Sequence, residues 1–322
     1  MAAREDPEMA RAALDGLEAY GIAERPSREE PKPEIARVGS ATLRDHGGSG
    51  PPAILVPSLI NPPSILDLDA EVSLASAVAG MGRRALLIDW GEAGERAGLS
   101  VSGHIEQLLL PLIRALDEPA ALVGYCLGGT MAIAASNLGP AERVATLAAP
   151  WHFDAYTTEG RENLGAMWRD TRPTAETLSA LPMEVLQAAF WSLDPKRTVA
   201  KFAMFAGFEP ASPEARRFVQ LEDWANEGEP LPYPAARELF EDFFAADSPG
   251  KGDWTIGGKT IRVPESVPLL HVTAAHDRIT PAAAAPPGQT AQLETGHVGM
   301  IVGSARTRLH QELRRFLDPA CR

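Results

Sequence analysis

The sequence predicts an α/β protein whose mostly parallel sheet is covered by helices on both faces. Between residues 53 and 148, short aliphatic runs alternate with helical patterns of about 10–15 residues. A cysteine in a Gly-x-Cys-x-Gly context directly follows one of these runs. The alternation stops near Pro150 and resumes near residue 268. The sheet is therefore expected to carry an inserted, mainly helical cap.

The elements follow in order along the chain. Residues 7–20 predict a helix, because their apolar positions line one helical face. Further helices are expected at 69–80, 102–116, 127–137 and 300–317. Strands are expected at 53–56, 84–89, 120–124, 144–148, 268–273 and 289–294. An opening strand or hairpin is expected at 35–45, and a hairpin closed by Gly257-Gly258 is expected at 254–263. The glycine-rich stretch 47–50 is expected to form a hairpin turn.

Four regions follow from this pattern. Residues 1–34 are a helix and a charged, Pro-rich linker, and 35–151 are the first part of the core. Residues 152–253 are the cap, which is expected over the carboxyl ends of the strands, where open α/β sheets bind ligands. Residues 254–322 complete the core. The cap is rich in aromatic residues, which are expected mainly in its core: Trp168, Phe190, Trp191, Phe202, Phe205, Phe208, Trp224, Phe240, Phe243 and Phe244.

Composition excludes several classes of function. The net charge of −13 argues against nonspecific binding to nucleic acid or anionic membranes, and a polyanionic substrate would need a local Arg or Lys cluster. Two cysteines, Cys126 and Cys321, are too few for a disulfide framework. The N-terminus has no signal-peptide pattern, and no stretch of about 18 apolar residues would span a membrane. A soluble, cytoplasmic protein is expected.

Cys126 is the candidate nucleophile. Its segment, GYCLGGT, matches the nucleophile elbow, in which small neighbours are needed at a tight strand-to-helix turn. Side chains at Gly124 or Gly128 would collide with nearby backbone. A cysteine acyl-enzyme is a thioester, so acyl transfer from another thioester is nearly isoenergetic. The thiol therefore favours acyl transfer over ester hydrolysis, although a lone buried cysteine is usually a small core residue.

The elbow predicts the α/β-hydrolase fold and the order of its partners: nucleophile, acid, then histidine after the last strand. Asp277 follows LLHVT and His297 follows QTAQLE, so they are the expected acid and base, although Asp277 alone fits a turn or helix cap. The oxyanion hole would use the backbone N–H of Leu127 and that of Leu59 or Ile60. The other histidines lack ligand spacing, and no metal site is expected.

Six collinear segments carry a resemblance to a known family: GYCLGGT, ILVPSLINPPSILDLD, LLIDWG, FVQLEDWANEG, HDRITP and GHVGMIVG. Together they resemble polyhydroxyalkanoate synthases from about residue 50 to 317, and the short N-terminal part is similar to the compact catalytic subunits. The family triad carries onto Cys126, Asp277 and His297. Two departures are Arg278, where the family commonly has His, and a shortened Ala/Pro connection after it.

The resemblance implies polymerisation of (R)-3-hydroxyacyl-CoA into a polyester stored in cytoplasmic granules, with no cofactor beyond the coenzyme A thioester. It also implies a homodimer and a helical partner subunit. Two alternatives stay open. One is a cysteine-nucleophile hydrolase that acts on an ester, lactone or thioester. The other is a non-catalytic granule-associated relative, which would have no need to retain all three triad residues.

Overall fold

The computed structural model describes residues 6–25 and 30–318, which divide into two compact units. One unit comprises the described parts of Met1–Pro31 together with Met183–Gly228. The other comprises the described parts of Lys32–Pro182 and Glu229–Arg322. Cys321 lies outside the described residues. All of the predicted site residues lie in the second unit, which is called the core unit below.

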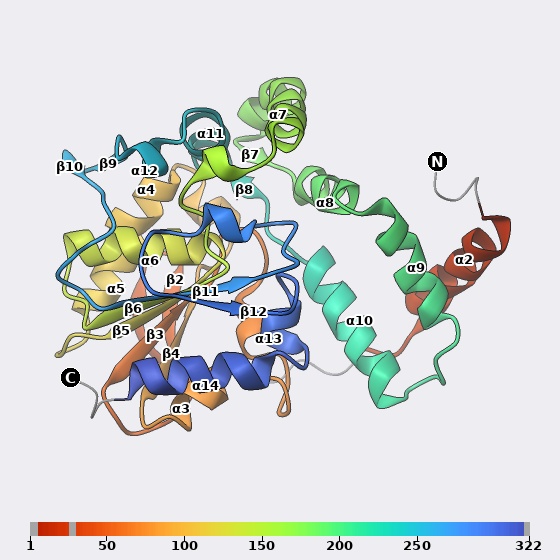
Figure 1. Cartoon of the computed structure of the whole chain (residues 1–322), viewed down its shortest axis with the longest axis horizontal. Helices are drawn as coiled ribbons and strands as arrows, with labels where there is room; N and C mark the ends of the chain where they lie inside the picture. The colour runs from red at the N-terminus through yellow and green to blue at the C-terminus, as the bar shows by residue number, and fades with distance from the viewer. Residues whose placement is uncertain (1–5, 26–29, 319–322) are drawn as a thin grey trace. The chain divides into compact units, whose positions relative to one another are not determined.

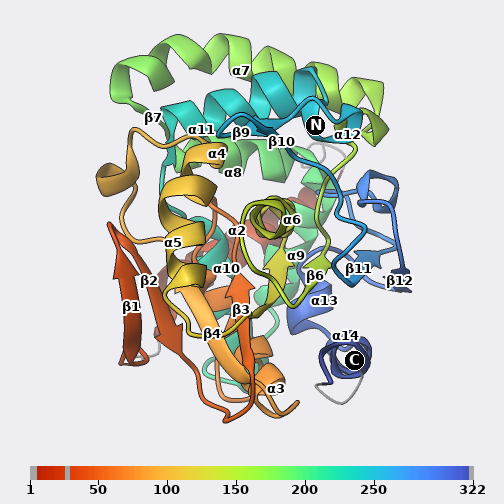
Figure 2. The same cartoon turned by 90° about the vertical axis from the view of Figure 1, so that its left-hand side faces the viewer.

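The core unit contains one sheet of eight strands in the order β1-β2-β4-β3-β5-β6-β11-β12 (Figure 2). The strands β1 and β2 form an antiparallel hairpin and β2 pairs antiparallel with β4, whereas all the remaining pairs are parallel. The strand bounds are β1 Glu34–Val38, β2 Ala41–Asp45, β3 Pro52–Val56, β4 Arg84–Asp89, β5 Ala121–Tyr125, β6 Arg143–Leu147, β11 Leu269–Ala274 and β12 Thr290–Leu293. The central strands β3, β5 and β6 are buried throughout, as expected for a sheet covered on both faces.

Helices cover both faces of this sheet (Figure 1). On one face lie α3 (Leu74–Ala79) and α14 (Arg306–Leu317), which pack against each other. On the other lie α6 (Leu127–Leu138) and the continuous stretch made of α4 (Val101–His104), the π-helical η3 (Ile105–Leu109) and α5 (Leu110–Arg114). The predicted α/β architecture is therefore confirmed.

Several local predictions were wrong for identifiable reasons. The helix expected over 69–80 begins only at Leu74, because Ser73 caps it by accepting the N–H of Ser76. The helix expected over 300–317 is broken into α13 (Gly299–Val302) and α14, since the chain becomes extended at Gly303.

The glycine-rich stretch 47–50 is not a hairpin turn, because β2 and β3 are not neighbours in the sheet. Instead the chain crosses over the start of β4. Gly48 has φ +89°, and a Cβ there would lie 1.9 Å from the carbonyl oxygen of Arg83. The predicted hairpin at 254–263 does form, with β9 (Thr255–Ile256) and β10 (Lys259–Thr260) joined by two glycines of positive φ.

The segment between β6 and β11 is mainly helical, but the structure divides it. The core unit keeps η4 (Phe153–Ala155), α7 (Thr158–Leu178), α11 (Tyr233–Arg237), the π-helical η5 (Glu238–Ala245), α12 (Ser248–Lys251) and the short strands β7 (Ala180–Leu181) and β8 (Leu231–Pro232). Phe153 anchors this part through rings of Phe243 and Phe244, with centroids 5.3 and 5.0 Å away. The short 3-10 turns η1 (Pro63–Leu66), η2 (Ala93–Arg96) and η6 (Ala282–Ala284) lie in loops that follow β3, β4 and β11.

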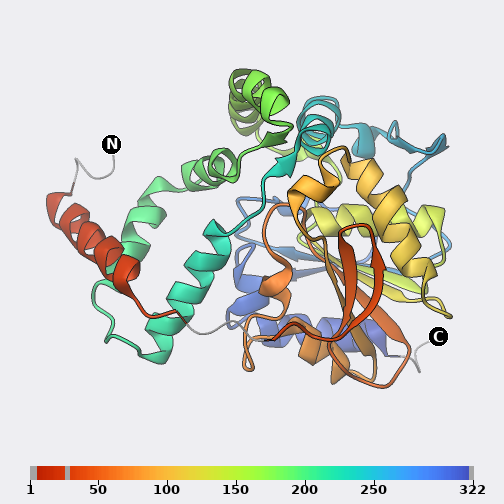
Figure 3. The ribbon, with the colours of Figure 1, turned by 180° about the vertical axis from the view of Figure 1, so that it is seen from behind.

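The other unit combines α2 (Pro7–Ile22) with α8 (Met183–Ser192), α9 (Pro195–Phe205) and α10 (Pro213–Asn226). Helices α2 and α9 lie side by side (Figure 3), because Gly16 lets the backbones meet: a Cβ there would lie 1.8 Å from the Phe202 carbonyl oxygen. The Tyr20 hydroxyl donates to Asp223 at 2.5 Å. The boundaries predicted for a single cap at 152–253 and a separate N-terminal region therefore differ from this division. The cause is the contact between α2 and α9, which the local sequence of neither helix predicts.

Candidate active site

Cys126 occupies the tight turn between β5 and α6. Its backbone has φ 55° and ψ −131°, a conformation that costs a non-glycine residue about 1–3 kcal/mol. The surrounding backbone holds it there. The Cys126 N–H donates to the Leu147 carbonyl, and the Cys126 carbonyl accepts from Gly129, both at 2.9 Å. The residue is half-buried.

The two elbow glycines are required by close backbone contacts, as predicted. A Cβ on Gly124 would lie 2.4 Å from the Gly128 carbonyl oxygen. A Cβ on Gly128 would lie 2.1 Å from the Val56 carbonyl oxygen and 2.6 Å from that of Pro57. Side chains essentially never approach backbone this closely. The contact of Gly128 also places the start of α6 directly against the loop that follows β3.

Asp277 and His297 come together at the ends of neighbouring strands. Asp277 follows β11 and His297 follows β12, and the parallel pairing of these strands brings both loops to one edge of the sheet. The Nδ1 atom of His297 lies 2.7 Å from Oδ2 of Asp277. Oδ1 of Asp277 accepts the backbone N–H groups of Ile279 and Thr280, each at 2.8 Å. The carboxylate is thus oriented by its own loop and aimed at the imidazole.

The imidazole also lies near enough to the Cys126 thiol for the two groups to interact electrostatically, which brings all three predicted residues into one site. Burial alone would lower the pKa of His297. The negative charge of Cys126 and the hydrogen bond to Asp277 outweigh that effect and raise the pKa to about 10. A histidine in this setting readily accepts and holds the thiol proton.

Two tyrosines of the site were missed from the sequence. Tyr125 is the variable residue of the elbow, and its ring lies 5.1 Å from the His297 ring. Burial, followed by the negative charges of Cys126 and Asp277, raises its pKa well above the usual value. Burial and the same two charges raise the pKa of Tyr156, whose hydroxyl bonds Thr280. The position of Tyr125 next to Cys126 in the sequence could have indicated that it lies at the site. No residue near Tyr156 in the sequence indicated this.

The predicted oxyanion donors lie on the two segments that Gly128 brings together. Leu127 is the first residue of α6, where a backbone N–H has no partner within the helix. On the loop after β3, the Ile60 N–H is directed at the Ser58 hydroxyl, 3.4 Å away. That contact favours Leu59 over Ile60 as the second donor, and the assignment stays a prediction.

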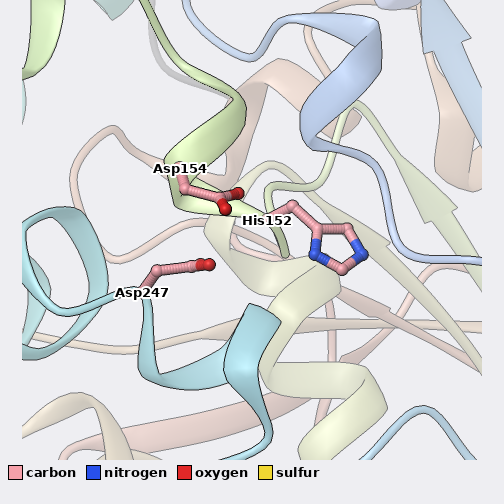
Figure 4. A group of neighbouring side chains, drawn as sticks. All are labelled: His152, Asp154 and Asp247. Atoms are coloured by element: carbon pink, nitrogen blue, oxygen red, sulfur yellow. The ribbon is translucent and has the colours of Figure 1, made fainter. Parts of the chain in front are cut away.

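Within residues 6–25 and 30–318, one group of side chains has the spacing of a cation site (Figure 4). His152, Asp154 and Asp247 each offer one ligand atom within 4.8 Å of the others. However, Oδ1 of Asp247 accepts the Phe153 N–H at 2.7 Å, which gives this buried acid a structural role in holding η4. Acidic groups near one another do not by themselves define a metal site, and the expectation of no metal stays a prediction.

The remaining histidines have separate surroundings. His276 is exposed and its Nε2 atom lies 3.4 Å from the Glu294 carboxylate. His46 lies 2.8 Å from Asp67, and the buried His271 is bonded to the Thr146 hydroxyl at 2.8 Å. Burial lowers the pKa of both His104 and His271 to about 4. These histidines have partners or surroundings other than Cys126, whereas His297 interacts electrostatically with it.

The fold and the site together define the class: an α/β-hydrolase fold whose elbow carries cysteine in place of the usual serine. Solved structures agree on the fold. A hydrolase from Pseudomonas aeruginosa PA01 is 18% identical with a TM-score of 0.56, and covers 90% of this chain and 99% of its own. An N-acyl homoserine lactone degrading enzyme is 17% identical with a TM-score of 0.52, and covers 88% of this chain and all (100%) of its own.

Sequence relatives are more specific. The poly(3-hydroxyalkanoate) polymerase subunit PhaC of Haloarcula marismortui is 26% identical over 94% of this chain and 69% of its own length. The subunit of the same name from Haloferax mediterranei is 27% identical, over 81% of this chain and 56% of its own. That of Thiocystis violacea is 24% identical, over 83% and 80%. No protein-family profile matches the chain. The resemblance to the polyhydroxyalkanoate synthases is confirmed.

No helix among the described residues is both long enough and apolar enough to cross a membrane.

Proposed function

We propose that this chain is the catalytic acyltransferase that polymerises (R)-3-hydroxyacyl-CoA into polyhydroxyalkanoate. The observation that carries the proposal is the Asp277–His297 hydrogen bond beside a cysteine that sits on a nucleophile elbow and interacts electrostatically with the imidazole. The names of its sequence relatives supply the substrate class. The chemistry requires only the coenzyme A thioester and no further cofactor.

In the first half-reaction, His297 takes the Cys126 proton and the thiolate attacks the thioester carbonyl. The oxyanion is stabilised by the N–H groups of Leu127 and of Leu59 or Ile60. Each such donor contributes about 3–4 kcal/mol in comparable enzymes. The carbon–sulfur bond to coenzyme A then breaks, and the coenzyme A thiolate leaves with the proton held by His297. Asp277 keeps the imidazole in the correct tautomer throughout.

In the second half-reaction, the hydroxyl of another hydroxyacyl group attacks the enzyme thioester. His297, again neutral, accepts the hydroxyl proton as the new ester bond forms and the Cys126 thiolate departs. Acyl transfer from the enzyme thioester to an alcohol is downhill, whereas the same transfer from a serine ester would be nearly isoenergetic. Water has to be excluded in this step, since hydrolysis would end the polymer chain.

The aromatic cluster in the segment that follows β6 supports such exclusion. Tyr156 lies in this segment, near enough to Cys126 and Asp277 to feel their charges. Its ring packs against Phe244 with centroids 5.1 Å apart. We propose that these rings shield the nucleophile from water. We also propose that the chain acts as a homodimer at polymer granules together with a helical partner subunit, in line with its family resemblance.

The test is incubation of the purified protein with 3-hydroxybutyryl-CoA, with coenzyme A release followed by thiol titration and the product analysed by mass spectrometry. We expect coenzyme A and polymer from the wild type and neither from Cys126→Ala. Accumulation of free 3-hydroxybutyrate instead would identify a hydrolase. Absence of acyl labelling on Cys126 would identify a non-catalytic relative, and turnover by Cys126→Ala would refute the mechanism.

A further inference from the structure

The Trp90 side chain is hydrogen-bonded to the loop that is proposed to supply one of the oxyanion donors. It follows β4 directly, is 3% exposed, and donates its indole N–H to the Pro57 carbonyl at 3.2 Å. Pro57 begins the loop after β3, which carries Leu59 and Ile60. The indole therefore bonds the backbone of this loop two residues before the expected donor.

Both the backbone and the ring of Trp90 are held by neighbouring residues. The Trp90 backbone carbonyl accepts the Ser40 hydroxyl at 2.9 Å. The next residue, Gly91, has φ +70° and packs so tightly that a Cβ would lie 2.4 Å from the Ser40 carbonyl oxygen. The His104 and Trp90 rings pack in a T-shaped pair with centroids 6.0 Å apart. A donor fixed in this way can define where the Pro57 carbonyl points.

The direction of that carbonyl matters for the elbow. In a planar trans peptide the C=O and the following N–H point in opposite directions, so fixing the Pro57 carbonyl fixes the plane from which the 58–60 backbone continues. The same Pro57 carbonyl lies against Gly128, the second residue of the elbow helix. The two segments that supply the oxyanion donors are thus aligned at one peptide group.

We propose that Trp90 is a positioning residue for the oxyanion hole, which acts on catalysis by holding the Pro57 peptide in the orientation that presents the Leu59 N–H to the substrate carbonyl. The inference rests on the proposed acyl transfer at Cys126. Without the indole donor, the buried Pro57 carbonyl would have to find another partner, and the loop would turn to provide one.

Two reactions of Cys126 separate positioning from general stability. Acylation by a thioester generates an oxyanion and needs the hole, whereas alkylation by iodoacetamide needs only the reactive thiol. In Trp90→Phe we expect acylation by S-phenyl thioacetate to fall by about tenfold, less than the 100–1,000-fold typical of losing a donor outright. Alkylation of Cys126 is expected to be unchanged.

Trp254→Phe is the matched control. Trp254 is 4% exposed and its indole N–H bonds Ser102 at 2.9 Å and Glu238 at 3.1 Å, away from the 57–60 loop. Its acylation rate should equal that of the wild type. Ser40→Ala, which frees the Trp90 carbonyl, provides a milder second variant with the same selective loss in smaller measure.

Equal acylation by Trp90→Phe and wild type, or a parallel fall in acylation and alkylation, would overturn the inference. The outcome is separable from that of the proposed function. If S-phenyl thioacetate acylates Cys126 but 3-hydroxybutyryl-CoA yields neither coenzyme A nor polymer, the substrate assignment fails. The role of Trp90 is then still decided by the ratio of the two rates.

Discussion

Replacing Asp277 by Asn should remove the base function of His297 while leaving the site nearly unchanged in shape. Oδ1 of Asp277 accepts two backbone N–H groups at 2.8 Å, from Ile279 and Thr280. In the variant, the amide oxygen must take that place, because an amide NH₂ group there would face two donors. The NH₂ group is then forced toward Nδ1 of His297, where Oδ2 now lies 2.7 Å away.

An NH₂ group donating to Nδ1 makes this nitrogen the acceptor and moves the ring proton to Nε2, the atom that must receive the thiol proton. The same substitution in a serine protease triad lowers turnover about 10⁴-fold. We expect a similar fall in Cys126 acylation, which corresponds to about 5 kcal/mol of lost transition-state stabilisation. The loss of the nearby charge also lowers the pKa of His297 in the variant.

The assay is single-turnover acylation of Cys126 across a range of pH, with unfolding temperature measured in parallel. Asp247→Asn is the control, because Asp247 is also buried and also accepts a backbone N–H, from Phe153, without bonding His297. It should acylate at the wild-type rate. If Asp277→Asn retains more than about a tenth of wild-type acylation, the tautomer argument is refuted.

Three further predictions follow from the same contacts. The pKa of His297 in the folded state is near 10 and lies above its unfolded value, so its contribution to the free energy of unfolding is complete below about pH 6.5 and is lost as the pH rises toward 10. In Cys126→Ala the pKa of His297 measured by NMR should be lower, and an unchanged value would contradict the assigned cause. The pKa of His271 is shifted in the opposite direction, to near 4, so denaturant unfolding should show that stability is lost as the pH falls from about 6.5 to 4. His271→Gln should flatten that pH dependence, and an unchanged dependence would contradict the burial argument. Gly128→Ala should lower the melting temperature and the acylation rate together, because its Cβ would lie 2.1 Å from a backbone oxygen and overpacking costs about 1–3 kcal/mol or more. The control Gly103→Ala, whose Cβ would make ordinary contacts at 3.5 Å, should fold normally, and equal behaviour of the two variants would refute the reasoning.

Much of the site could be predicted because the α/β-hydrolase fold ties chain order to position. The apolar run before Gly124 had to be a strand, and the cramped turn after it required small neighbours. Once Cys126 was placed at the end of a central strand, the loops after the next strands could only meet at the same edge. Asp277 and His297 were found by that logic, without any contact being visible in the sequence.

The parts that escaped prediction depend on contacts between distant segments. Gly16 in α2 resembles any helical glycine until the Phe202 carbonyl is seen against it. Likewise Tyr156 resembles a loop residue until β6 and the loop after β11 bring it beside Thr280. The glycines at 47–50 have the composition of a turn, but Gly48 serves a crossing over the Arg83 backbone. In each case the local pattern is compatible with several roles, and tertiary packing selects among them.

The strain at Cys126 shows which part of this enzyme has to be rigid. A conformation that costs about 1–3 kcal/mol persists only where surrounding structure over-determines it, and here β6, α6 and the β3 loop all contact the elbow. The Cys126 N–H is held by Leu147 and the elbow helix is seated on Val56 and Pro57. The fold therefore holds the thiol in place before any substrate binds, and no binding energy is needed to assemble the nucleophile.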